Sequence, residues 1–146
     1  MNQTTEAVKL FSSGFNCAQS VFVPYAEEAG LPREQAFKLS CGFGAGKGRQ
    51  QKTCGAVTGS YMVIGLKHGK YQQEDNPARE KTYSLVKEFS KQFIKKNKTL
   101  ECSELLHCDL NTEEGNKYFQ EHQLHNDVCV KCVTDANNIL NAILEE

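Results

Sequence analysis

Apolar residues in this chain recur at intervals of three and four, which predicts helices rather than strands. The clearest pattern covers 77–97, where one buried stripe is formed by Ala78, Thr82, Leu85, Val86, Phe89 and Phe93. Further helices are predicted over about 4–12, from Cys17 to a kink or an end near Pro24, from Pro32 to about Cys41, behind Thr99, from Asn111 to about Leu124, and over about 128–144. We therefore expect an all-α fold, a single-domain bundle of six to eight helices over residues 1–146.

The stretch 53–66 predicts a buried helix that opens with a thiol. Thr53 is a good N-cap residue, which would place Cys54 at the first helical position. Unpaired amides and the helix dipole favour negative charge there, so we expect Cys54 to be more readily a thiolate. Gly55 and Gly59 lie one turn apart, and each costs roughly 1 kcal/mol of helix propensity. We expect another backbone or a cofactor to pack closely against them, and simple helix–helix packing is the plainer alternative.

Seven cysteines in 146 residues are many for a chain with no secretory leader in view. The formal net charge of −1 gives no reason to expect a nucleic-acid partner, and no run of 18 apolar residues predicts a membrane span. A cytoplasmic location is the default expectation. Thiols in a reducing compartment seldom form a structural disulfide framework, so metal ligation or redox chemistry is the leading interpretation.

Four cysteines are predicted in the first turn of a helix, each behind a capping residue. They are Cys17 behind Asn16, Cys54 behind Thr53, Cys102 behind Thr99 and Cys129 behind Asp127. Helix N-termini that converge would form one electropositive spot. Such a spot suits thiolates, an exchanging pair of thiols or an anionic thiolate-ligated cluster.

Cys129 and Cys132 form a CxxC pair, and residues three apart in a helix lie on one side of it. Both sulfurs could therefore serve as a dithiol or as two metal ligands. His122 and His125 precede the pair, so a Cys/His zinc site is conceivable, although two solvated histidines are the commoner outcome.

The segment 42–52 alternates glycine with other residues and carries three basic side chains. It is not a Walker loop, because glycine rather than serine or threonine follows Lys47. We expect either a flexible surface turn or a lid over a cofactor or an acidic small molecule. The residues expected to contact such a ligand are Gly44, Gly46, Lys47 and Arg49.

Several motifs in this order are similar to a known family. They are Gly14–Val21, the loop 42–49, Cys54–Gly59, Cys102–Leu106, Asp109–Leu110 and Cys129–Cys132. Together they resemble the redox-active proteins named for a C-GCAxxG-C-C cysteine pattern. The pattern carries onto Cys17, Cys54, Cys102 and Cys129, and it leaves Cys41, Cys108 and Cys132 as additions. The resemblance implies a redox role, and relatives in electron-transfer proteins imply an iron–sulfur site.

We therefore expect a small redox protein whose four pattern cysteines, with Cys108 and Cys132 nearby, ligate an iron–sulfur cluster or another metal for electron transfer. A variant of this hypothesis has no metal and cycles a dithiol with a disulfide. The alternatives are a zinc-stabilised binding module without redox turnover and a helical protein that binds a small anion. The expected partners are a redox protein or a small anionic molecule, and the glycine-bearing helix could equally serve a homodimer.

Overall fold

The computed structural model describes residues 3–144 and confirms the all-α prediction. The elements are α1 (Gln3–Ser12), α2 (Cys17–Glu28), α3 (Arg33–Cys41), α4 (Gly44–Lys47), α5 (Gly55–His68), α6 (Asn76–Asn97), α7 (Cys102–Leu106), α8 (Glu113–Glu121), a π-helical segment (His125–Cys129) and α9 (Val130–Leu144). Within this described part, the one β-type pairing joins Thr53 to Glu101.

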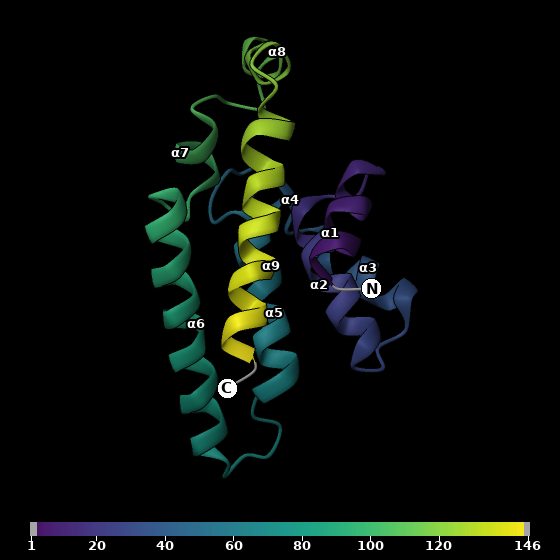
Figure 1. Ribbon diagram of the computed structural model, residues 1–146, viewed down its shortest axis with the longest axis vertical. Helices are drawn as coiled ribbons and strands as arrows, with labels where there is room; N and C mark the ends of the chain where they lie inside the picture. The colour runs from purple at the N-terminus through teal and green to yellow at the C-terminus, as the bar shows by residue number, and fades with distance from the viewer. Residues whose placement is uncertain (1–2, 145–146) are drawn as a thin grey trace.

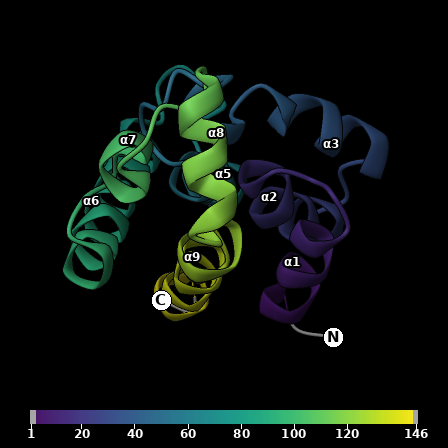
Figure 2. The same cartoon turned by 90° about the horizontal axis from the view of Figure 1, so that it is seen from above.

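Helix α5 lies at the centre of the bundle. It packs against α2, α6 and α9, while α2 also contacts α1 and α3. In Figure 1, α5, α6 and α9 run alongside one another, and α7 and α8 lie toward the same end of the molecule. Figure 2 shows the same arrangement from above, with α1, α2 and α3 on the side of α9 opposite α6 and α7.

The core forms where these helices meet. Its largest fully buried side chains include Val21, Val57, Ile64, Phe89, Phe93, Val133, Ile139 and Leu140. The stripe predicted on α6 is only partly buried, because Phe89 and Phe93 are enclosed while Leu85 and Val86 are half-buried. No helix among residues 3–144 combines the length and the apolar character needed to cross a membrane.

Glycines allow α2 and α5 to approach closely. A Cβ on Gly59 would lie 2.9 Å from the carbonyl oxygen of Ala18 on α2, inside normal contact distance. A Cβ on Gly65, two turns further along α5, would meet nothing within 4 Å. Another backbone therefore packs against Gly59, and because it belongs to helix α2, the plainer alternative of helix–helix packing accounts for this glycine. The close contact offsets the helix propensity that glycine loses.

Two predicted helix boundaries are wrong for local reasons. For α2 the sequence predicted a kink or an end near Pro24, and the end does not occur, because α2 continues through Pro24 to Glu28. Proline removes one backbone N–H but leaves the apolar face intact, and Phe22, Val23 and Ala26 are all buried in the core. The predicted cap Thr53 is also displaced, because Cys54 itself stands at the cap of α5.

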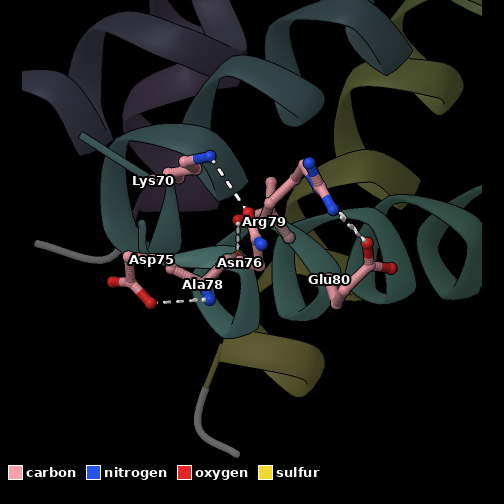
Figure 3. A network of polar contacts seen from close by, with 7 residues as sticks. Lys70, Asp75, Asn76, Ala78, Arg79 and Glu80 are labelled. Carbon is pink, nitrogen blue, oxygen red and sulfur yellow. Dashed lines mark hydrogen bonds and ion pairs between the residues drawn. The ribbon is translucent and has the colours of Figure 1, made fainter. Parts of the chain in front are cut away.

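The start of α6 follows the prediction closely. The carboxylate of Asp75 accepts a hydrogen bond from the Ala78 amide at 3.2 Å, and proline occupies the first turn. Nearby, the Lys70 ammonium donates to the Asn76 side chain at 3.1 Å, as Figure 3 shows. The Asp75 bond satisfies one of the backbone amides that would otherwise lack a partner at this helix end.

Replacing Gly59 with Ala should lower the free energy of unfolding by about 1–3 kcal/mol, because α2 and α5 must move apart. Gly65→Ala is the matched control in the same helix, and it should raise the free energy of unfolding by about 0.5–1 kcal/mol through helix propensity. Urea unfolding of the reduced proteins measures both values. A Gly59→Ala protein as stable as the Gly65→Ala protein would contradict the close contact.

Candidate functional site

The four pattern cysteines come together at one end of the bundle. Cys17 is the first residue of α2, Cys54 caps α5, Cys102 is the first residue of α7, and Cys129 ends the π-helical segment. All four line one cavity of about 360 Å³, and Cys132 lines it as well. We call this space the cysteine cavity. The expectation that both sulfurs of the CxxC pair face one site agrees with this placement.

Backbone hydrogen bonds hold the beginnings of α5 and α7 side by side. The Cys54 amide donates to the carbonyl oxygen of Leu100 at 2.7 Å, and the Cys102 amide donates to that of Lys52 at 2.7 Å. These two hydrogen bonds flank the Thr53–Glu101 bridge. Because Thr53 is held in this pairing, it does not cap α5. Glu101, rather than the predicted Thr99, precedes α7 as its cap. The result is that two cysteines far apart in sequence start two adjacent helices.

Cys129 reaches the cavity in a different way from the one predicted. Asp127 does not cap a helix there, because it lies inside the π-helical segment that runs without interruption into α9. The Val130 amide donates to the carbonyl oxygen of His125, five residues earlier. Such a widened turn often occurs at functional sites.

Three sulfurs form a contact chain in the wall of the cavity. The Cys17 side chain lies close enough to Cys54 to shift its pKa, and Cys54 lies equally within reach of Cys132. Gly55 makes room for the first pair, because a Cβ there would lie 2.4 Å from Cys17 Sγ. Cys54 and Cys132 are buried, whereas Cys17 is half-buried. Cys17 is thus the more accessible end of the chain.

The electrostatics of these thiols are the opposite of the sequence expectation. The hydrogen bond to Cys54 and burial raise the pKa of Cys17 well above its ordinary value, although the N–H groups of Ala45 and Ala18 donate to its sulfur and oppose that rise. The pKa of Cys54 is also raised, first by its hydrogen bond to Cys132 and then by burial. These thiols therefore keep their protons, because burial and neighbouring sulfurs outweigh the effect of the helix end.

The other cavity thiols behave in the same way. Burial, followed by the charges of neighbouring cysteines, raises the pKa of Cys102 from 9.0 to about 12 and that of Cys129 from 9.0 to about 12. Cys108 lies outside the cavity wall but close enough to influence both, and burial raises its own pKa. Cys41 is exposed on α3 and is not among the cavity residues.

The glycine segment forms a left-handed turn rather than an open lid. Residues 45–49 all have positive φ, between 52° and 69°, which is costly for residues other than glycine. Of the contacts predicted from sequence, Arg49 lines the cavity, while Gly44, Gly46 and Lys47 do not. The backbone of Ala45 lines it too. No sequence pattern singled out Ala45, because its contribution is an amide oriented by backbone conformation.

Gln51 is a site residue that the sequence analysis did not identify. Its side chain is buried, donates to the carbonyl oxygen of Cys108 at 2.7 Å and accepts from the Leu110 amide at 2.8 Å. It also hydrogen-bonds Cys102 and so lowers the pKa of that thiol against the larger effect of burial. A buried glutamine in a polar loop gives no periodic signal by which it could have been found.

The two histidines before the CxxC pair lie against different aromatic rings. His122 stacks on Tyr118 with ring centroids 3.9 Å apart, whereas His125 stacks on Phe11 at 4.2 Å and lines the cysteine cavity. Among residues 3–144, no group of three or more Cys, His, Asp or Glu side chains is arranged so that it could hold a metal ion.

The raised thiol pKa values predict a loss of stability in alkali. Unfolding returns Cys102 and Cys129 to pKa values near 9, so between pH 9 and about 12 the folded state holds protons that the unfolded state has lost. The stabilisation from these two thiols should be fully present below pH 9. Above pH 9 the free energy of unfolding should fall by about 1.4 kcal/mol per thiol for each pH unit. Urea unfolding of the reduced protein across pH 7–11 measures this slope. The double variant Cys102→Ala, Cys129→Ala should show a shallower slope, and equal slopes would contradict the raised values.

The sequence comparison agrees with this geometry. The family model described as "Putative redox-active protein (C_GCAxxG_C_C)" matches residues 15–143, which include every cysteine that lines the cavity. No curated protein and no solved structure shows significant similarity to the chain. Because the match covers most of the sequence, this chain belongs to the C_GCAxxG_C_C family of redox-active proteins.

Proposed function

We propose that the chain is a thiol redox protein that carries electron pairs by converting two cavity cysteines between dithiol and disulfide. The observation that carries this proposal is the contact chain from Cys17 through Cys54 to Cys132. Formation of a disulfide needs two thiols in contact, and here Cys54 has a partner on either side. Membership of a redox-active family supports the same conclusion.

Cys17 is the proposed attacking residue, because it is the accessible end of the chain and its sulfur receives two backbone N–H groups. Its sulfur attacks one sulfur of a disulfide RSSR, forms Cys17–S–S–R and expels RS⁻. The thiol proton passes, through water or the His125 imidazole on the cavity wall, to that RS⁻, which leaves as RSH. Cys54 then attacks the Cys17 sulfur and expels the second RSH. Two thiols are oxidised and one external disulfide is reduced to two thiols, and the steps reverse when the external thiols are in excess.

Because the cavity disfavours thiolates, we expect the transfer of electrons to be coupled to the transfer of protons. Two neutral thiols become one neutral disulfide, so two protons leave with two electrons and no net charge is buried. The midpoint potential should therefore fall by about 59 mV per pH unit, without a break where ordinary thiols ionise.

A redox titration with thiol-specific mass labelling tests this proposal between pH 6 and 9. The expected result is one two-electron couple with a constant slope of about 59 mV per pH unit. Cys54→Ser should abolish that couple, because Cys54 contacts both alternative partners, whereas Cys41→Ser is the control and should leave it unchanged. Absence of a couple, a slope that flattens below pH 8, or equal effects of the two substitutions would refute the proposal.

A second candidate is thiolate ligation of an iron–sulfur cluster. The type and number of the donors support it, whereas the arrangement of the side chains among residues 3–144 does not, because no group of three or more is placed to hold a metal ion. Thiolates are the usual ligands of such clusters, and five cysteines line one cavity. Cys17, Cys54, Cys102 and Cys129 would hold the group, which would supply one-electron transfer when bound. Zinc held by the same sulfurs is the corresponding non-redox alternative.

Purification without oxygen separates the two candidates. The dithiol proposal predicts a colourless protein with substoichiometric iron and sulfide that still shows the two-electron couple. Iron and acid-labile sulfide bound in stoichiometric amounts, lost in the Cys17→Ser protein but kept in the Cys41→Ser protein, would favour the cluster instead. Stoichiometric zinc with no redox couple would favour the binding module.

A further inference from the structure

The cysteine cavity has the size and the lining of a site for a small organic molecule. Its volume of about 360 Å³ lies in the range of ligand pockets. Its walls are largely apolar and include Phe15, Leu106 and Phe119, and a few polar side chains lie between them. A ligand here would bury most of its surface while its reacting end touches sulfur.

Arg49, an exposed residue, is the arginine among the residues that line the cavity. The described residues that line the cavity include no Asp or Glu. Arg33 and Arg79 form ion pairs with Glu27 and Glu80, whereas no ion pair among residues 3–144 involves Arg49. An unpaired guanidinium beside an apolar cavity favours an anionic ligand, for which its planar fork of donors is suited.

The backbone holds Arg49 in this place at some cost. Its φ of 65° is in the left-handed region, at the end of the turn 45–49. Its carbonyl oxygen accepts a hydrogen bond from the Asn111 side chain at 2.7 Å. Two residues later, Gln51 ties the segment to the backbone of Cys108 and Leu110. Strain that is held by contacts from both sides is typical of functional sites.

We propose that the cavity takes a low-molecular-weight disulfide that carries a carboxylate, with the carboxylate on Arg49 and the disulfide against Cys17. This inference rests on the dithiol function proposed above and adds its substrate class. The juxtaposition of one cation and one accessible sulfur in the same small cavity selects both ends of such a molecule. The reaction is the thiol–disulfide exchange described above. One substrate disulfide yields two carboxylate-bearing thiols, and the protein gains one disulfide.

Stopped-flow oxidation of the reduced full-length chain by three disulfides tests the proposal. The probes are 3,3′-dithiodipropionate, which is a dianion, 2-hydroxyethyl disulfide, which is neutral, and cystamine, which is a dication. Each rate is divided by the rate of the same disulfide with free 2-mercaptoethanol, so that intrinsic reactivity cancels. The wild-type chain should prefer the dianion over the neutral disulfide by about tenfold.

Variants in the same turn provide the controls. Arg49→Gln should remove the preference by slowing the reaction with the dianion about tenfold more than the reaction with the neutral disulfide, whereas Arg49→Lys should keep most of the preference. Lys47→Gln removes the same charge two residues away, outside the cavity wall, and should retain the preference.

The outcomes distinguish failure of the proposed substrate class from failure of the dithiol function. Three results would overturn the substrate class and leave the dithiol function standing. The first is reaction with all three disulfides without a preference for the dianion. The others are an equal loss of that preference in Arg49→Gln and Lys47→Gln, and an equal slowing of the neutral and anionic probes by Arg49→Gln. Failure of the reduced chain to react with any of the three probes would overturn the dithiol function and this inference together.

Discussion

The central constraint in this molecule is that several buried or half-buried thiols share one cavity in which negative charge is poorly tolerated. Cys17 and Cys54 interact directly, Cys54 also interacts with Cys132, and burial keeps their neighbours protonated. Charging one sulfur makes it harder to charge the next, because like charges repel strongly in a medium of low dielectric constant. The chemistry open to such a group either removes protons in step with electrons or brings in a positive charge.

The rest of the fold serves to bring these sulfurs together. Glycines let α2 lie directly on α5, so the Cys17 sulfur sits over Gly55 next to Cys54. The hydrogen bonds around the Thr53–Glu101 bridge place α7 beside α5, and the π-helical segment carries Cys129 to the same cavity. The left-handed turn then supplies an amide to Cys17 from one side. Each of these features is local. Together they bring into one cavity residues that are more than a hundred positions apart in sequence.

The sequence reveals the fold class and the identity of the gathered cysteines, because both depend on local patterns. Apolar spacing identifies α6, and Asn16 is visible as the cap that places Cys17. It does not reveal the protonation of the thiols, since the helix-end effect is local whereas burial and sulfur–sulfur contact arise only from tertiary packing. The same limit explains Thr53 and Asp127, whose capping roles are displaced by long-range pairing and by a widened turn. Arg49 was predicted from its loop to contact a ligand, and it lines the cavity, while Gln51 and Ala45 act through geometry that no pattern encodes.

The most direct measurement of this account is the position of the first disulfide that forms when the reduced chain meets one equivalent of oxidant. Alkylation of the remaining thiols, proteolysis and mass spectrometry identify the linked peptides. The account predicts that Cys54 is bonded to Cys17 or to Cys132, with Cys41 alkylated. Bonds that mainly involve Cys41 or Cys108, with Cys54 left as a free thiol, would contradict it.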